Sequence, residues 1–223
     1  SGVPAAAIAT YAERESVDLV VVGACGSGGA RRALLGSVSR QLIESPRHAV
    51  AVVADHRGKG EDGEDGEFDG RPLVVGTDGS DGAARAVRWA ATTAARAGGE
   101  VVVVHAFAPP VPDLSAREQA SLLDEATRRL DEEWCAPLRA TGVRYRTVVA
   151  RDDARSLLRS VADAERPACV VVGSRGLGAL SQRLLGSITH SLVRAVDWPV
   201  VVVPSPRDRP IWPPTGATRL TPP

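Results

Sequence analysis

Short apolar runs, most of them rich in valine, alternate along the chain with longer alanine-rich stretches whose apolar residues follow helical spacing. Continuous apolar runs of this length are typical of parallel strands that helices cover on both faces. Such strands, alternating with helices, predict an α/β fold with a doubly wound parallel sheet. The expected strands are residues 19–22, 50–53, 73–75, 101–104, 148–149, 170–172 and 200–203.

Capping residues and glycines indicate where the helices between these strands begin and end. Ser80 can accept hydrogen bonds from the free amides at the start of a helix, and Gly98 is a typical helix stop. Helices are therefore expected at residues 4–15, 80–97, 115–140, 152–164 and 187–196, and the third is the longest.

The sequence contains an internal repeat with a constant offset. Gly23 and Ser37 recur as Gly173 and Ser187, in each case 150 residues later, and the segments around them align without gaps. About three strand–helix units precede the second copy of this element, whereas the first copy has room for only one helix and one strand. We therefore expect a partial domain over 1–54, which holds only the back half of the fold, and a complete domain over 71–205.

Two further segments differ in composition from the rest of the chain. Residues 55–70 contain many glycines and clustered acids but almost no apolar residue, so they cannot bury enough surface to offset the entropy of ordering. We interpret them as a flexible linker, and an acidic partner-binding segment is the less favoured alternative. Residues 206–223 are rich in proline and are expected to form a disordered tail.

Composition excludes several classes of function. The 223 residues carry 27 Lys and Arg against 27 Asp and Glu, and a net charge of zero argues against a nucleic-acid partner. No apolar run approaches the roughly 20 residues of a membrane span, and no signal peptide is recognised, so we expect a cytoplasmic protein without a membrane partner. The three cysteines and four histidines lack metal-ligand spacing, which predicts buried thiols and no metal site. Methionine is absent even from position 1, so Ser1 is interpreted as an internal or processed start.

The repeated element has the spacing Gly-x2-Gly-x9-Gly-Ser, formed by Gly173, Gly176, Gly186 and Ser187 between an apolar strand and a helix. Glycines let a backbone approach an anion closely, and the free amides at a helix N-terminus favour negative charge. The same glycines also suit a tight turn with no ligand. Asp78, which follows the first strand of the complete domain, could meet ribose hydroxyls or a phosphate-bound metal, or could only cap the next helix.

Several segments together resemble the universal stress protein family, in its nucleotide-binding branch: RPLVVGTDGS, RWAATTAARAGGEVVVVHAF, VVVGSRG and LLGSITHSLVRAVDWPVVVVP. The resemblance implies a Rossmann-like fold of the adenine nucleotide alpha hydrolase type, with five parallel strands in the order 3-2-1-4-5. It also implies ATP or a similar adenine nucleotide, with Mg²⁺ on the phosphates. Family members pair through their last strands, so we expect either a homodimer or pairing of residues 50–53 with 200–203 inside one chain.

The resemblance also implies which residues contact the nucleotide. They comprise the turn after the first strand, an adenine contact after the second strand, and the glycine motif for ribose and phosphate: Gly76, Thr77, Asp78, Ala106, Val172, Gly173, Gly176, Gly186, Ser187 and Ile188. Family members usually carry a larger aliphatic residue where this chain has Ala106. His105 is expected to be structural, and Arg175 either pairs with phosphate or is simply exposed. The first copy lacks the strand-one acid, so we expect no nucleotide there and an open edge on the strand at 19–22.

Three functions remain open at this point. The first is a stress-response module that binds ATP without dedicated catalysis, because no nucleophile–base pair and no Gly-Lys-Ser/Thr phosphate loop is present. The second is a protein-interaction module of the same fold that binds no nucleotide, in which the glycines are architectural. The third and least favoured is an enzyme of the adenine nucleotide alpha hydrolase group.

Overall fold

The computed structural model describes residues 4–24, 35–44, 46–53, 70–107, 114–177, 186–195 and 198–205. The strands are β1 (Leu19–Gly23), β2 (Ala49–Val53), β3 (Leu73–Gly76), β4 (Glu100–Ala106), β5 (Arg144–Ala150), β6 (Cys169–Gly173) and β7 (Val200–Val203). The helices are α1 (Pro4–Arg14), α2 (Ser37–Glu44), α3 (Asp81–Ala97), α4 (Ala116–Arg129), the π-helical turn η1 (Leu130–Trp134), α5 (Ala136–Thr141), α6 (Ala154–Glu165) and α7 (Ser187–Ala195).

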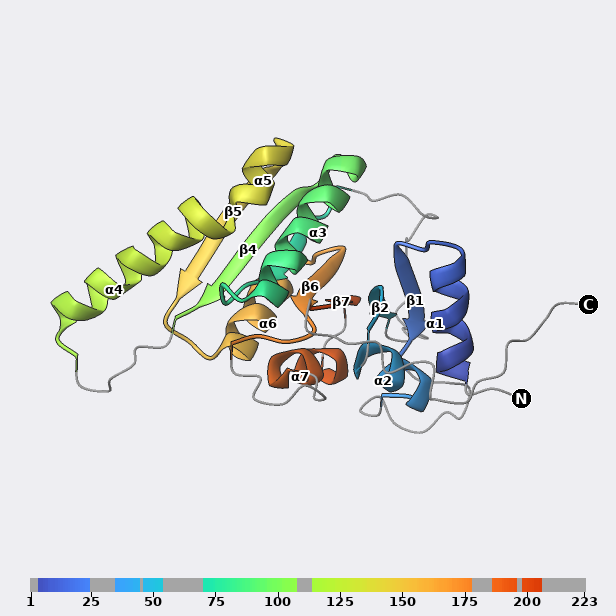
Figure 1. Cartoon of the computed structure of the whole chain (residues 1–223). Helices are drawn as coiled ribbons and strands as arrows, with labels where there is room; N and C mark the ends of the chain where they lie inside the picture. Colours follow the sequence, from blue (N-terminus) through green and yellow to red (C-terminus); the bar gives the residue numbers. More distant parts are fainter. Residues whose placement is uncertain are drawn as a thin grey trace, which may run out of the picture.

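The strands form one mostly parallel sheet in the order β1-β2-β7-β6-β3-β4-β5, flanked by helices (Figure 1). The five strands β3 to β7 have the predicted order 3-2-1-4-5 when β3 is counted as the first strand. All neighbours among these five strands are parallel. The predicted pairing of the two last strands is also present, because β2 runs antiparallel to β7 with Val50 opposite Val202. Strand β1 pairs with β2 and forms the end of the sheet, as expected for an open edge.

The five strands between the edge strands β1 and β5 bury side chains on both faces, which explains their continuous apolar runs. On one face, Val75, Val103 and Val171 pack with α3, η1 and α5. On the other face, the alternate residues, such as Val74 and Val102, pack with α2, α6 and α7. Two layers of helices therefore cover the sheet, as the apolar pattern predicts.

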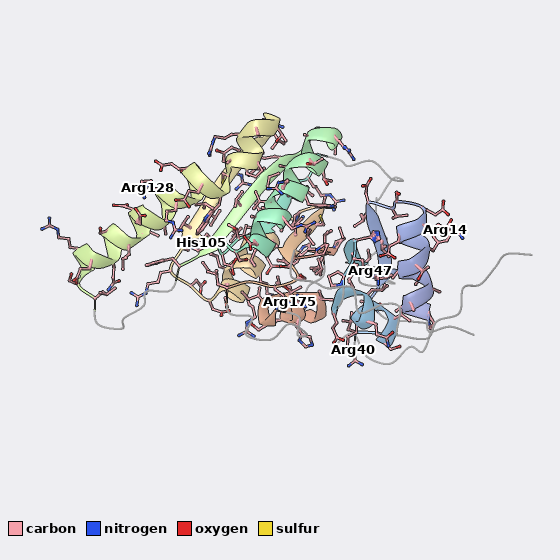
Figure 2. The ribbon with its side chains drawn as sticks, in the orientation of Figure 1. Arg14, Arg40, Arg47, His105, Arg128 and Arg175 are labelled. Carbon is pink, nitrogen blue, oxygen red and sulfur yellow. The ribbon has the colours of Figure 1, made fainter. Side chains whose placement is uncertain are left out.

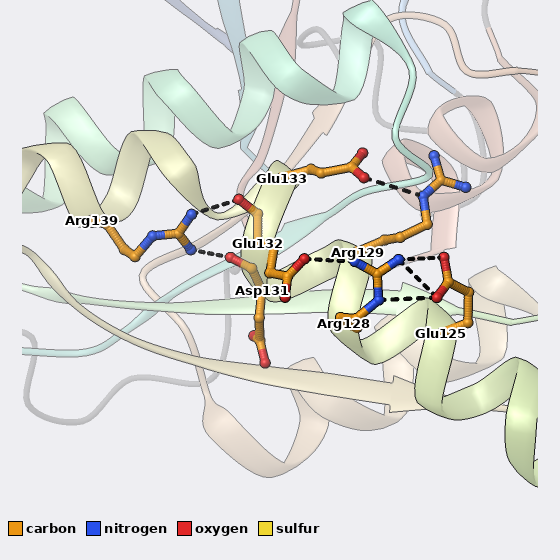
Figure 3. Close-up of polar contacts among 7 residues, drawn as sticks. All are labelled: Glu125, Arg128, Arg129, Asp131, Glu132, Glu133 and Arg139. Carbon is orange, nitrogen blue, oxygen red and sulfur yellow. Dashed lines mark hydrogen bonds and ion pairs between the residues drawn. The ribbon is translucent and has the colours of Figure 1, made fainter.

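The prediction of a single helix at residues 115–140 is wrong. The structure divides it into α4, the π-helical turn and α5. The amide of Cys135 donates to the carbonyl oxygen of Leu130 at 2.9 Å, a step of five residues, and Pro137 has no amide hydrogen to continue a helical ladder. The guanidinium group of Arg139 stabilises the turn, because it donates hydrogen bonds to the carbonyl oxygens of Asp131 and Glu132 (Figure 3).

Strand β5 is longer than the expected strand at 148–149. Its first residues alternate in exposure, because β5 is an edge strand with charged side chains on its exposed positions. Helix α2 was not among the predicted helices. The remaining elements begin and end within about two residues of their predicted bounds. The expected linker at 55–70 lies outside the described residues except for Gly70, and the tail at 206–223 lies outside them entirely. In the described residues, no helix has both the length and the apolarity to cross a membrane.

The sequence repeat is also a repeat of hydrogen bonds. In each copy the residue after the glycine-ended strand donates to the last residue of the neighbouring strand, a glycine amide closes the loop, and a helix hydroxyl donates to the strand glycine. The first copy has Ala24 N to Val53 O (2.8 Å), Gly36 N to Ala24 O (2.7 Å) and Ser39 Oγ to Gly23 O (2.6 Å). The second copy has Ser174 N to Val203 O (2.8 Å), Gly186 N to Ser174 O (2.9 Å) and Thr189 Oγ1 to Gly173 O (2.8 Å).

Candidate functional site

The carboxyl ends of β3 and β6 lie side by side, because these two strands pair in parallel. The carboxylate of Asp78, in the turn after β3, joins them. Its Oδ1 accepts a hydrogen bond from the amide of Ser80 at 3.0 Å, and its Oδ2 accepts one from the amide of Leu177 at 2.8 Å. Asp78 therefore holds the loop after β6 against the turn after β3, while the capping role belongs to Ser80. Each carboxylate oxygen still has lone-pair capacity for a further donor.

The close approach of neighbouring groups explains why two residues of the motif are glycines. A Cβ atom on Gly173 would lie 2.7 Å from the carbonyl carbon of Gly82 in α3, and a Cβ atom on Gly176 would overlap Oδ2 of Asp78. Gly186 differs, because the nearest atom to its Cβ, the carbonyl oxygen of Ser174, would be at an ordinary 3.5 Å. Packing therefore requires glycine at the first two positions but not at the third.

The start of α7 presents backbone amides beside this loop. The amide of Gly186 is used by Ser174, and the first helical bond runs from His190 to Gly186. The following amides, of Ser187 and Ile188, have no acceptor among the residues that the structure describes. Free amides at a helix N-terminus can donate to an anion such as phosphate.

The ends of β3 and β4 are fixed by His105. Its Nδ1 lies 2.9 Å from the carbonyl oxygen of Thr77, so this nitrogen carries the hydrogen and donates, as a structural histidine would. The side chain of Thr77 is buried, and its amide donates to Val104 at 2.9 Å. Ala106 follows His105 at the end of β4 and is half-buried, with Ala150 of β5 opposite.

Trp134 is a site neighbour that the sequence did not indicate. Its ring packs against the His105 ring in a T-shaped arrangement with a centroid distance of 4.9 Å, and it would overlap a Cβ atom on Gly79. Gly79 also has a φ of 77°, which favours glycine. The π-helical turn brings Trp134 to this place, so no regular helical pattern could have predicted the contact.

Arg175 lies in the loop after β6 and is half-buried. Its carbonyl oxygen would overlap a Cβ atom on Gly82, so the loop packs directly on the first turn of α3. Figure 2 shows Arg175 and His105 on the side of the molecule toward which β4 and β5 run. Of the remaining predicted residues, Val172 is buried, and Gly76 and Ile188 are half-buried.

The first copy keeps part of the motif. Gly23 ends β1, Gly36 precedes α2 and Ser37 begins it, but Gly26 lies outside the described residues. Strand β1 forms the end of the sheet, so no described strand lies where β3 lies beside β6. In the described residues there is no group of three or more His, Cys, Asp or Glu side chains that could hold a metal ion. Cys135 and Cys169 are buried free thiols.

Three comparisons relate the chain to known proteins. The model of the universal stress protein family matches residues 1–54 and 70–204. Universal stress protein Rv2005c of Mycobacterium tuberculosis (strain ATCC 25618 / H37Rv) is 34% identical over 192 residues, which cover 83% of this chain and 61% of that protein. The chain thus spans about three fifths of the length of this relative.

A solved structure shows the same fold. A putative universal stress protein from Pseudomonas aeruginosa UCBPP-PA14 has a TM-score of 0.70 at 15% identity, and the match covers 93% of this chain and 70% of that one. A universal stress protein crystallised in complex with cAMP is 30% identical, covers 60% of this chain and 96% of its own, and has a TM-score of 0.46.

Proposed function

Because the chain belongs to the universal stress protein family, we propose that it binds ATP, or a similar adenine nucleotide, as a regulatory module without a dedicated catalytic step. Residues 71–205 form the binding unit in this proposal, and residues 1–54 are a partial copy that binds no nucleotide. The proposed contacts are Gly76, Thr77, Asp78, Ala106, Val172, Gly173, Gly176, Gly186, Ser187 and Ile188.

The observation that carries this proposal is the hydrogen bond between Asp78 and Leu177. It holds together the turn after β3 and the loop after β6 at the point where the strand order reverses, since β4 lies on one side of β3 and β6 on the other. Ligands of open α/β sheets bind in the crevice at such a point, outside the carboxyl ends of the strands. A carboxylate, a glycine loop and a helix N-terminus lie at the carboxyl ends of β3 and β6, where such a crevice is expected.

Each part of this crevice has a role that fits a nucleotide. The amides of Ser187 and Ile188, which have no acceptor among the described residues, would donate to phosphate oxygens, and the Ser187 hydroxyl adds a further donor. The small side chain of Ala106 leaves room for a base beside the end of β4. Bound Mg²⁺ would neutralise part of the phosphate charge, and it would arrive with the nucleotide.

Calorimetric titration with ATP and Mg²⁺ tests the proposal. We expect about one nucleotide per chain, no binding by Gly186→Val because the added side chain fills the space beside the α7 amides, and at least about tenfold weaker binding by Asp78→Ala. Asp81→Ala is the matched control, because Asp81 is an exposed acid three residues after Asp78, in the first turn of α3. The affinity of this variant should stay within about threefold of the parent. A stoichiometry near two would contradict the proposal for residues 1–54. ADP and cAMP, titrated in the same way, identify the preferred nucleotide.

The second candidate is an interaction module that binds no nucleotide. The packing of Gly173 against Gly82 and of Gly176 against Asp78 favours it, because these contacts explain two glycines of the motif without a ligand. Helix α4, which buries only Ala126, offers an exposed surface beside β5 (Figure 1). If the folded chain binds none of the three nucleotides at millimolar concentration, this second function replaces the first.

A further inference from the structure

The turn that carries Asp78 packs directly on a tryptophan ring. A Cβ atom on Gly79, the next residue in the chain, would overlap Cζ2 of Trp134 and lie 3.0 Å from its Nε1. The backbone of Gly79 therefore lies against this ring, which η1 supplies from a distant part of the chain.

The same ring also supports the other side of the turn. It packs against the His105 ring at a centroid distance of 4.9 Å, and Nδ1 of His105 donates to the carbonyl oxygen of Thr77 at 2.9 Å. Within the turn, the amide of Gly79 donates to Oγ1 of Thr77 at 3.3 Å. Trp134 thus contacts the residue after Asp78 directly, and it supports the residue before Asp78 through His105.

Trp134 is itself held in place by its neighbours in the helical segment. Leu130 and Cys135, which precede and follow it, are fully buried in the core. The guanidinium carbon of Arg129 lies 5.5 Å from the ring centroid, at cation–π distance, and Arg129 pairs with Glu133 at 3.7 Å (Figure 3). A half-buried ring that is anchored in this way is a firm support for a glycine turn.

The path of the turn determines where the Asp78 carboxylate lies. Its hydrogen bonds from the amides of Ser80 and Leu177 both depend on the backbone conformation of Gly79 between them. Glycine has more backbone freedom than any other residue, so without the ring the turn can adopt conformations that move the carboxylate away from Leu177. A ligand would then have to order the turn when it binds, and such ordering weakens affinity.

We propose that Trp134 is a positioning residue of the nucleotide site. It keeps the turn at 77–80 in the conformation that directs the Asp78 carboxylate to the loop after β6, and it acts on the ligand only through Asp78. None of the residues assigned to the site above lies in η1. This role rests on the proposed binding of an adenine nucleotide.

Calorimetric titration of the full chain with ATP and Mg²⁺ tests this role. Trp134→Ala should weaken the affinity about tenfold, because the ligand must then order the turn. Trp134→Phe should keep the affinity within about threefold of the parent, because an aromatic ring still supports Gly79 and His105. If Trp134→Ala does not fold, Trp134→Leu replaces it, since leucine keeps apolar volume on the core but places no ring beside Gly79.

Trp89→Ala is the matched control. Trp89 is also half-buried and packs on the same core cluster as Trp134, but it lies with Leu19 and Val203 at a different surface. This variant should lose stability while its nucleotide affinity stays within about threefold of the parent.

Two readouts separate positioning from a general loss of stability. In the Asp78→Ala background, Trp134→Ala should weaken the affinity by less than a further factor of about two, because its effect passes through Asp78. Without nucleotide, NMR should show that the Leu177 amide exchanges with solvent at least about threefold faster in Trp134→Ala, and at the parent rate in Trp89→Ala.

The outcomes distinguish this inference from the proposed function. A parent chain that binds nucleotide, together with Trp134→Ala and Trp134→Leu variants that bind it equally well, would overturn the inference alone. An equal loss of affinity in the parent and Asp78→Ala backgrounds, or an unchanged exchange rate at Leu177, would also overturn it. A parent chain that binds no nucleotide would overturn the proposed function, and the role of Trp134 in affinity with it.

Discussion

Asp78 and Gly176 are coupled, because the carboxylate that holds Leu177 leaves no room for a side chain on Gly176. Gly176→Ala should displace the carboxylate and break this hydrogen bond, at a cost of about 1–3 kcal/mol in the free energy of unfolding. Urea unfolding measures that cost, and nucleotide affinity should fall in the same variant.

The Asp78→Ser background provides the control for this coupling. Serine is shorter, so the methyl group of Gly176→Ala meets no oxygen there, and the same substitution should cost less than about 0.5 kcal/mol. Equal costs in the two backgrounds would mean that the loop relaxes without using Asp78, and the assignment of Asp78 as the contact that holds the loop would be wrong.

The buried thiols predict a dependence of stability on alkaline pH. Burial raises the pKa of Cys169 from 9.0 to about 12, and burial followed by the charge of Asp131 raises the pKa of Cys135 to about 11. The unfolded chain therefore loses these protons first, so their contribution to stability is complete below pH 9 and declines as the pH rises toward 11 and 12. Urea midpoints measured from pH 8.5 to 11 should fall less steeply for Cys169→Ala than for the parent. Parallel slopes would contradict this.

The sequence identified Asp78 and the glycines but not the contacts that they make. The partner of Asp78 is a backbone amide 99 residues away, so the identity of Leu177 carried no signal. The interpretation of the motif as a phosphate site explained Gly173 and Gly176 by a close approach of the backbone to the anion. Packing of Gly173 on Gly82 and of Gly176 on Asp78 also requires glycine at these positions. A glycine pattern alone cannot separate these two causes, because both demand a close backbone approach.

Helix α3 begins against the loop after β6, and this packing depends on Gly82. A methyl group there would overlap the carbonyl oxygen of Arg175, a backbone atom that cannot rotate away. Gly82→Ala should therefore cost about 3 kcal/mol in thermal or urea unfolding. Gly99→Ala is the matched control beyond the other end of α3, where the nearest atom would be at 3.9 Å, and it should change stability by less than about 1 kcal/mol.

The division of the expected helix at 115–140 shows what periodicity leaves open. The spacing of apolar residues is helical up to Leu130, and nothing in that spacing indicates an inserted residue. The π-helical turn is stabilised by tertiary and capping contacts, namely Trp134 on His105 and Arg139 on the carbonyl oxygens of the turn (Figure 3). Such contacts exist only once the fold has formed, so the local sequence predicts the helix but not its interruption.

For the molecule as a whole, the internal repeat was the most informative signal in the sequence. It predicted that β2 and β7 are equivalent strands. The family resemblance implied that such strands pair, and the antiparallel register of Ala51 opposite Val201 confirms the pairing.

The pairing of β2 with β7 determines how the chain should assemble. Both strands are buried along their lengths, and β2 supplies the hydrogen-bonding partner that covers the outer edge of β7. A chain limited to residues 70–205 would expose that edge, and an open edge with four successive valines is a template for pairing with a second strand. Because β7 already accepts an antiparallel partner, two such chains should pair through their β7 strands. Light scattering should give a dimer for residues 70–205 and a monomer for residues 1–205 at the same micromolar concentration. A monomeric short form would show that β7 needs no partner strand, and its pairing with β2 would then serve only to anchor residues 1–54.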